Sequence, residues 1–289
     1  MGRRSRKNAA IRNGIAYKHH LNNLLMIAST RFKWEYLPSE IDERFLETTL
    51  CERGSVLFFE DDVVGFLTLP FTYGGSLDVY RNPILRNAYA VNGYRRTCNK
   101  TDSVIIYNNY IRISIFPELC YYAEKLAIVD RMIEINLNLH KHPKLLICDE
   151  SELSTMKATM RSYDDFEDAI YGKKGLNLQN IQAIDFGVPY ICDKLWELKL
   201  NIYNEVLSYL GVQSIPRQKN AHVIESEINA ENGATYASSD SFLMARLMAC
   251  DQINSMWGLN VTVHYNDTQK IMNAVQTALL EPAGGGGIG

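Results

Sequence analysis

The histidines, whose ring nitrogens are common metal ligands, occur in two clusters, His19-His20 and His140-Lys141-His142. Neither cluster has a cysteine or a carboxylate nearby at the spacing that zinc sites use. We therefore predict that the chain has no metal site, and we interpret both clusters as solvated histidines.

Paired carboxylates are the next candidates for chemistry, because acid–base catalysis needs two carboxyl groups held in different environments. Asp61-Asp62 and Asp164-Asp165 are immediate neighbours, and we interpret each pair as a solvated turn or helix face. Gly172-Lys173 lacks the upstream glycine and the following hydroxyl of a phosphate-binding loop. The sequence also contains no G-x-G-x-x-G, G-x-S-x-G or H-E-x-x-H motif. We predict a protein that is not an enzyme and uses no cofactor.

Six cysteines are scattered through the chain without a C-x-x-C pair. A chain of 289 residues can bury a full hydrophobic core without disulfide bonds, so we expect reduced thiols and assembly in a cytoplasm. The sequence has no run of 18 or more apolar residues of the kind that spans a membrane. Its charged N-terminus is not followed by the apolar segment of a secretory signal.

Charge is unevenly distributed along the chain. The formal net charge is only −3, but residues 1–34 hold eight lysines and arginines and no acid, so the other 255 residues carry −11. A basic arm on an acidic body suggests an anionic partner. The alternative is a disordered tail that keeps the chain soluble or docks on another protein. The arm residues that we expect to contact nucleic acid are Arg3, Arg4, Arg6, Lys7 and Arg12.

The elements that must position these side chains begin with two helices and a β-rich region. Residues 1–13 are expected to be a disordered arm. Apolar residues at three- and four-residue steps predict a helix over residues 15–35, ended by Pro38, and a shorter helix up to Arg53. Over residues 55–115 the pattern changes to β-branched and aromatic runs separated by turn residues, which indicates strands.

Two long predicted helices flank an insert in the middle of the chain. Pro117 opens the first helix, which runs to about His140, and Pro189 opens the second, which Gly211 ends. We expect residues 144–188 between them to contain two strands and an acidic helical piece. This arrangement predicts a helical hairpin with a small domain at its tip.

The last part of the chain opens with residues 212–238, which show no apolar periodicity. A structureless stretch of this length inside a domain is usually functional or disordered. Apolar spacing then predicts a helix from about Ser239 to Trp257 and a strand over residues 259–265. The glycine-rich residues 283–289 predict a flexible tail.

Four stretches of the sequence are specific when they are taken together and in order. They are Phe32-x-Trp34-Glu35-x-Leu37-Pro38; Val104-Ile105-Ile106-Tyr107-Asn108-Asn109; Pro189-Tyr190-x-x-Asp193-Lys194-Leu195, followed by Lys199, Asn204-Glu205 and Leu210-Gly211; and Cys250-x-x-Ile253-Asn254, followed by Gly258-Leu259-Asn260-Val261-x-Val263. Over about residues 20–265 this order resembles the head–tail connector (portal, or upper collar) proteins of small short-tailed bacteriophages of the Picovirinae type.

The resemblance implies an α+β, mainly α, portal-type fold. Two long stem helices would flank a small α/β clip, and a β-containing wing and a channel loop would complete the chain. The implied parts are a basic disordered arm (1–13), an N-terminal wing (14–116), a stem helix (117–143), the clip (144–188), a second stem helix (189–211), the channel loop (212–238), a wing helix and strand (239–267) and a C-terminal tail (268–289).

The resemblance also implies a function and a set of partners. Twelve copies would typically form a ring at one capsid vertex of the virion, as the conduit for double-stranded DNA during packaging and ejection. The implied protein partners are capsid and scaffolding proteins, the packaging ATPase and the lower collar or tail protein. A packaging RNA accompanies the motor in some relatives. No membrane partner is implied.

Four basic residues are the implied DNA-facing groups: Lys194 and Lys199 on the second stem helix, and Arg217 and Lys219 in the channel loop. The two lysines lie five residues apart, about 140° around the helix axis, so both cannot face the bore squarely. For each lysine, the alternative is solvation or a salt bridge between subunits, for example with Asp193 or Glu197. Sparse basic rings in an acidic body suit sliding, because dense positive charge would hold the phosphates.

A second class of protein is also compatible with the charge pattern. A non-portal nucleic-acid-binding protein with a basic N-terminal arm would be a monomer or dimer, and salt would weaken its binding to free DNA. A portal protein would instead form a stable ring without DNA.

Overall fold

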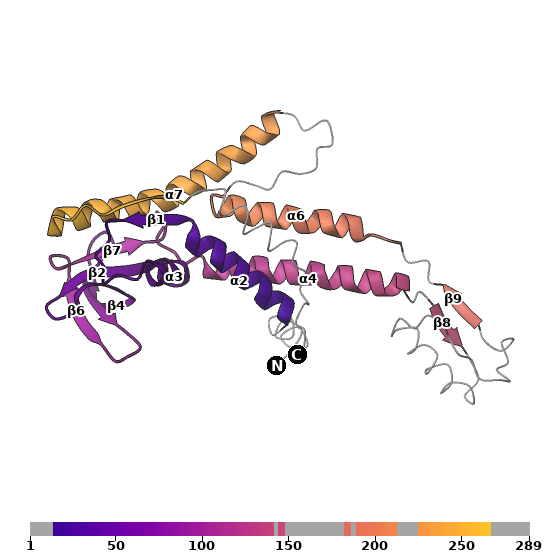
Figure 1. The fold of residues 1–289 in the computed structure, drawn as a ribbon, viewed down its shortest axis with the longest axis horizontal. Coiled ribbons are helices and arrows are strands. Elements are labelled where there is room, and N and C mark those ends of the chain that lie inside the picture. Colours follow the sequence, from indigo (N-terminus) through magenta and orange to yellow (C-terminus); the bar gives the residue numbers. More distant parts are fainter. Residues whose placement is uncertain (1–13, 142–143, 148–181, 186–188, 213–224, 267–289) are drawn as a thin grey trace. The chain divides into compact units, whose positions relative to one another are not determined.

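The computed structural model of the chain describes residues 14–141, 144–147, 182–185, 189–212 and 225–266; for 144–147, 182–185 and 225–237 it describes the backbone alone. The chain divides into two compact units, and Figure 1 labels its helices and strands. The first comprises the residues up to Val129 and those from Leu198 onward, and the second comprises Asp130–Glu197. The helices and strands, in chain order, are α2 (Ile15–Thr30), β1 (Phe32–Glu35), α3 (Glu43–Arg53), β2 (Ser55–Asp61), β3 (Gly65–Leu69), β4 (Phe71–Leu77), β5 (Pro83–Tyr89), β6 (Arg95–Asn99), β7 (Ser103–Tyr107), α4 (Phe116–Lys141), β8 (Lys144–Ile147), β9 (Gln182–Asp185), α6 (Cys192–Tyr209), α7 (Glu225–Trp257) and β10 (Thr262–Tyr265).

Two three-stranded antiparallel sheets form the β-rich part of the first unit, in the strand orders β3-β2-β7 and β4-β5-β6. The central strand β2 pairs Leu57 with Leu69 on one side and with Ile105 on the other. Its apolar run packs together with Ala88 and Cys98 from β5 and β6. A run that is buried along its whole length is typical of a central strand between packed layers, and the predicted β-rich region is therefore present.

The helix α3 ends at Gly54, as the sequence predicts. Its first turn is capped by Asp42, whose side chain accepts a hydrogen bond from the Phe45 amide (3.1 Å). Gly54 has φ +79°, and a Cβ atom there would lie 2.5 Å from the backbone nitrogen of Ser114. Only glycine fits this position. Any other residue would strain the backbone at this positive φ, and its Cβ would collide with the backbone of Ser114.

The predicted helix over residues 15–35 is too long. It ends at Thr30, and the next residues form β1, which pairs with β10 in an antiparallel two-stranded sheet. Phe32 and Trp34 are buried, whereas Lys33 and Glu35 between and after them are exposed. This alternation has the period of a strand, and four residues are too few to distinguish it from a helical spacing.

A buried ion pair joins α7 to α3. Arg246 is fully buried; its Nη2 lies 2.8 Å from Oε2 of Glu47, and its Nε lies 2.9 Å from Oε1. Nε1 of Trp34 donates to the same carboxylate (2.8 Å), and Nη1 of Arg246 donates to the carbonyl oxygen of Asn108 (2.8 Å). Removing two charges from water is costly, and this bidentate, well-bonded geometry offsets the cost.

A second buried arginine, Arg31, lies beside this pair. The ring of Phe32 has the guanidinium of Arg246 at 4.0 Å and that of Arg31 at 5.1 Å from its centroid. Burial, with a smaller contribution from Arg246, lowers the pKa of Arg31 to about 10. Nη1 of Arg31 donates to the carbonyl oxygen of Leu210, so this residue connects α2 to the end of α6. It is one of the eight basic residues near the N-terminus but is not available to an external partner.

Two residues interpreted as solvated are engaged in the fold. His20 is buried, and its Nδ1 lies 3.0 Å from the hydroxyl of Tyr203. Asp61 accepts a hydrogen bond from the hydroxyl of Tyr94 (2.6 Å) and two from backbone amides of the turn that follows β2. These bonds, led by that of Tyr94, lower the pKa of Asp61 to about 2. The tyrosine partners of His20 and Asp61 are distant in the sequence, so the local spacing of residues could not indicate these two bonds.

The cysteines of the described residues are free thiols. Burial raises the pKa of Cys51 to about 11 and that of Cys250 to about 12, so both remain protonated at neutral pH. Within the described ranges, no group of three or more His, Cys, Asp or Glu side chains is placed to hold a metal ion. None of the helices in that part of the chain is long and apolar enough to cross a membrane.

The helix α7 begins at Glu225, well before the predicted start near Ser239. The expected loop therefore differs from the structure over residues 225–238. This stretch is rich in glutamate and alanine, which favour helix without an apolar stripe. The prediction relied on periodicity, and periodicity appears only where α7 packs on the core, from Phe242 onward. Residues 213–224 lie outside the described part.

We predict that Arg246→Met lowers the free energy of unfolding by about 3 to 5 kcal/mol, because it leaves the Glu47 carboxylate buried without its counter-ion. Thermal or urea unfolding of the purified protein measures the change. The matched control is Lys33→Met, which removes the exposed pair that Lys33 forms with Glu43 (2.5 Å) and should cost less than about 1 kcal/mol. Equal losses in the two variants would contradict the assigned role of the buried pair.

Candidate functional site

The candidate site is the pair of long helices α4 and α6, which run antiparallel beside one another. In the first unit, the rings of Tyr122 and Tyr209 are 6.4 Å apart, and Nζ of Lys125 lies 3.6 Å from Oε2 of Glu205. In the second unit, Asn136 of α4 bonds to the start of α6. The predicted helical hairpin is therefore present.

Asn136 fixes the start of α6. It is 5% exposed; its Nδ2 donates to the carbonyl oxygen of Pro189 (3.1 Å), and its Oδ1 accepts from the backbone nitrogen of Ile191 (3.1 Å) and from Sγ of Cys192 (3.3 Å). The first amides of a helix have no partner within the helix. Here Asn136, on the neighbouring helix, supplies a partner for the amide of Ile191. The contact fixes where α6 begins, and therefore the position of Lys194 in its first turn.

The two lysines predicted on this helix have different surroundings. Lys194 is exposed and forms no salt bridge with any residue of its own chain that the structure describes. Lys199 is half-buried and takes part in an interaction. This difference in burial agrees with their separation of about 140° around the helix axis. Lys194 is thus the lysine with its ammonium group open to solvent.

The other predicted contact residues lie outside the described part of the chain. These residues are Arg217 and Lys219 of the expected channel loop, and Arg3, Arg4, Arg6, Lys7 and Arg12 of the arm.

The two ends of the expected loop are described, and they are held together. Oγ of Ser238 donates to the carbonyl oxygen of Tyr209 (2.5 Å), which is the last residue of α6. Gly211 has φ +73°, and a Cβ atom there would lie 2.6 Å from Cα of Ser239. The hydroxyl of Tyr265 donates to the carbonyl oxygen of Ser239. These contacts close the base of the expected loop within the first unit.

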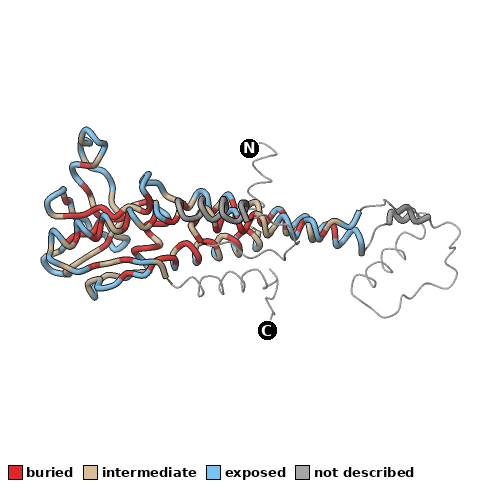
Figure 2. The backbone as a smooth tube through the Cα atoms, turned by 90° about the horizontal axis from the view of Figure 1, so that it is seen from above, coloured by how far each residue is buried: buried red, intermediate tan, exposed pale blue. Residues whose placement is uncertain are grey.

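The helix pair exposes several large apolar side chains. On α4, Met132, Ile135 and Leu139 follow one another at three- and four-residue steps, so they lie on one face of the helix. They are 43%, 45% and 37% exposed, respectively. Figure 2 shows that most of α4 beyond Asp130 is exposed. Exposed apolar faces of this kind mark protein–protein contacts.

The sequence analysis missed two buried polar residues, one that joins the helix pair and one in the core of the first unit. Asn136 follows Val129 and Ile133 at four- and three-residue steps, where a further apolar residue of the buried stripe would be expected. Arg246 likewise lies four residues after Phe242 and three before Ala249 in the buried stripe of α7. A polar residue at a core position of an apolar stripe is the signal that could have found both, because such a residue is buried only with partners.

The structure is similar to solved structures of phage portals. A chain of the structure titled "Portal and tail of native bacteriophage P68" matches with a TM-score of 0.50 and 17% sequence identity. The match covers 94% of this chain and 93% of that chain. A portal protein of the HK97 family from Corynebacterium diphtheriae gives a TM-score of 0.43, 10% identity and coverages of 92% and 97%. A chain of the virion of a native gene transfer agent particle gives 0.44, 11% identity and coverages of 94% and 87%. The first likeness shows a portal-type fold.

The sequence matches the family described as Phage Connector (GP10) over residues 2–270. This match covers most of the chain, and the chain belongs to that family. It is a head–tail connector, or portal, protein, and a connector is a part of the virion. The expected α+β portal-type fold, function and place in the virion are confirmed. The alternative of a non-portal nucleic-acid-binding protein is not favoured.

We predict that Asn136→Ala loosens the contact between the two helices. Loss of a helix cap costs about 1 to 2 kcal/mol, so amide hydrogens at the start of α6 should exchange about 5 to 30 times faster. Hydrogen exchange followed by mass spectrometry on peptides that contain Ile191–Leu195 measures this. The control is Asn138→Ala, because Asn138 is exposed on the same helix. Unchanged exchange in Asn136→Ala would exclude the capping role.

Proposed function

We propose that about twelve copies of this chain form a ring at one capsid vertex, and that double-stranded DNA passes through the ring during packaging and ejection. The observation that carries the proposal is the match to the phage connector family over residues 2–270. The antiparallel pair of α4 and α6 supports it, because two long helices joined at one end can line a channel when they repeat around an axis.

The exposed apolar face of α4 supports the ring. Met132, Ile135 and Leu139 are each more than a third exposed in the single chain. Burying the exposed part against a neighbouring copy would contribute about 25 cal/mol for each Å² of apolar surface removed from water. A closed ring satisfies every copy in this way and leaves no unpaired apolar face.

Lys194 is the described residue best placed to meet DNA in such a ring. Because it is exposed and has no salt-bridge partner among the described side chains, a ring would carry one free ammonium group per copy at a single level. Such a circle of charges contacts the phosphate backbone without reading sequence. Lys199, on a different side of α6, would contribute a second and weaker circle.

Two basic groups outside the described residues are proposed to act with Lys194. Arg217 and Lys219 would contact DNA from the channel loop and retain it after packaging. The arm residues Arg3, Arg4, Arg6, Lys7 and Arg12 would bind nucleic acid outside the channel, where a packaging RNA is one possible ligand.

The insert over residues 144–188 is proposed to be the clip that meets other proteins. Residues 149–168 hold seven acids against only Lys157 and Arg161, and such a surface favours a basic partner by electrostatic complementarity. The packaging ATPase would dock there first and the lower collar or tail protein later. Capsid and scaffolding proteins would contact the remaining outer surface, and the chain itself would have no catalytic role.

We predict that the purified protein forms rings without DNA. Mass photometry at micromolar concentration should show a species about twelve times the 32.9 kDa chain mass, and negative-stain images should show closed rings. A single species near the chain mass, with salt-sensitive DNA binding, would contradict the proposal and revive the alternative of a simple nucleic-acid-binding protein.

We predict that Lys194→Gln makes DNA binding by the rings less dependent on salt. Each phosphate contact that is lost reduces the slope of log K against log salt by about 0.9. Binding of short duplexes to rings at several salt concentrations measures the slope. The matched control is Lys33→Gln, because the ammonium of Lys33 is already paired with Glu43. Equal slopes for Lys194→Gln and the unaltered protein would exclude Lys194 from the DNA contact.

A further inference from the structure

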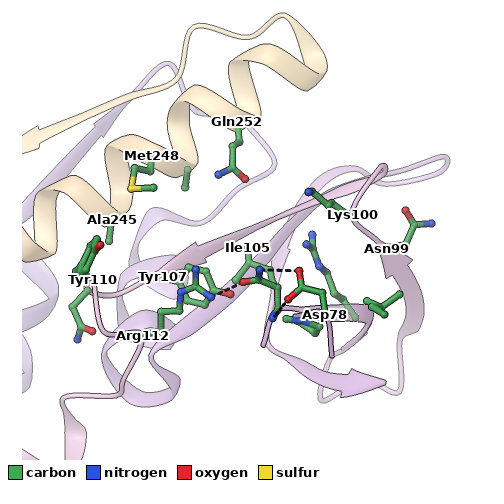
Figure 3. A pocket seen from close by; sticks show the side chains of 16 residues that line it. Asp78, Asn99, Lys100, Ile105, Tyr107, Tyr110, Arg112, Ala245, Met248 and Gln252 are labelled. Carbon is green, nitrogen blue, oxygen red and sulfur yellow. Dashed lines mark hydrogen bonds between the residues drawn. The ribbon is translucent and has the colours of Figure 1, made fainter. Parts of the chain in front are cut away.

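A groove of about 760 Å³ lies in the first unit between α7 and the two sheets. Figure 3 shows Ala245 and Met248 on α7 along one wall, with Lys100 and Arg112 across the groove from them. The groove therefore combines an apolar wall with a basic one. Neither wall belongs to the stem helices that are proposed to line the channel.

The basic wall contains a buried charge that lacks a counter-ion. Arg86 is 7% exposed, and its Nη1 donates to the carbonyl oxygen (2.5 Å) and the hydroxyl (3.1 Å) of Ser103. Its Nε has no hydrogen-bond partner in the described part of the chain, and no described carboxylate forms a salt bridge with it. Burial lowers the pKa of Arg86. A buried guanidinium without a carboxylate is costly, which indicates that an anion is missing.

The carboxylates near the groove are already occupied. Asp78 accepts hydrogen bonds from the amides of Tyr80 (2.9 Å) and Asn82 (2.7 Å) and from the side chain of Asn82 (2.9 Å). Asp102 acts on Arg86 only at longer range, and its Oδ1 accepts from the Asn99 amide (2.6 Å).

The cations of the groove outnumber its acids. Arg86, Lys100 and Arg112 line it together with one carboxylate, that of Asp78. Nη1 of Arg112 donates to Oδ1 of Asn82 (2.6 Å), which is a neutral acceptor, and Lys100 is exposed. The groove thus has two positive charges in excess on a chain whose net charge is negative.

The same chain carries a surface complementary to this groove. The turn between β2 and β3 presents Val63, which is 92% exposed, next to the exposed Asp62. Asp61 holds the turn in place, because its Oδ1 accepts from the amides of Val63 (3.0 Å) and Val64 (3.1 Å) and its Oδ2 from the hydroxyl of Tyr94. A protruding tip that is already ordered loses little entropy when it docks.

We infer that the β2–β3 turn of one copy docks into this groove of the next copy in the ring. The carboxylate of Asp62 supplies the missing anion to the basic wall, and Val63 packs against Met248. This inference rests on the proposed ring. A contact between two different surfaces of the same chain is heterologous, and such contacts form a ring when the rotation from copy to copy closes. The apolar wall on α7 favours a protein segment over the phosphates of a nucleic acid.

Charge exchange tests the contact. Lys100→Glu alone and Asp62→Lys alone should each raise the protein concentration at which half of the chains are in rings by about tenfold or more, because like charges then face each other. The double variant should return to within about threefold of the unaltered protein. Mass photometry over a dilution series measures these values. The control is Lys18→Glu, which makes the same charge change at an exposed position of α2 and should leave assembly unchanged.

Disulfide trapping gives a second readout that does not depend on the strength of assembly. A chain with both Val63→Cys and Met248→Cys should form covalent multimers up to the full ring on oxidation, and either single variant should not. Rings that tolerate Lys100→Glu, with no trapping, overturn the inference and leave the proposed function intact. If Lys100→Glu weakens DNA binding but not assembly, the groove is a phosphate site and the inference is wrong. An unaltered chain that never forms rings overturns both.

Discussion

The ion pair between Arg246 and Glu47 is the contact on which the first unit depends. It brings together α7, α3, the strand β1 through Trp34 and the end of β7 through Asn108. The two charged residues lie 199 positions apart, so the pair forms only when the N-terminal and C-terminal parts of the chain have met. A buried pair with all of these donors satisfied specifies one packing of the segments, because any other packing would leave a charge unpaired.

Polar contacts hold both ends of α6, the C-terminal end to the first unit and the N-terminal end to α4 within the second unit. Arg31 reaches the carbonyl oxygen of Leu210 where α6 ends, and Asn136 receives α6 where it begins. Buried side chains such as Tyr203 and Val206 pack the helix on the first unit. The partly exposed apolar residues of α4 are the surface that the proposed ring would bury.

Apolar periodicity predicted the elements that carry a buried apolar stripe or run, which include α4 as far as Val129, α6, β2 and β7. It failed for β1, because this four-residue strand forms by pairing with β10, which lies near the other end of the chain. It also failed for the first turns of α7, where propensity rather than packing favours helix. Lys194 came from resemblance, and the structure added its exposure. The groove could not be predicted, because its charges come from separate strands and turns that meet only in the folded chain.

The closed base at Gly211 and Ser238 limits how far a change in the length of the chain between these residues can affect the first unit. Contacts at these two residues already bring the two ends of that stretch together. Lengthening such a loop costs only about 0.6 kcal/mol for each doubling. We therefore expect insertions or tags placed between residues 212 and 225 to leave the stability of the first unit unchanged.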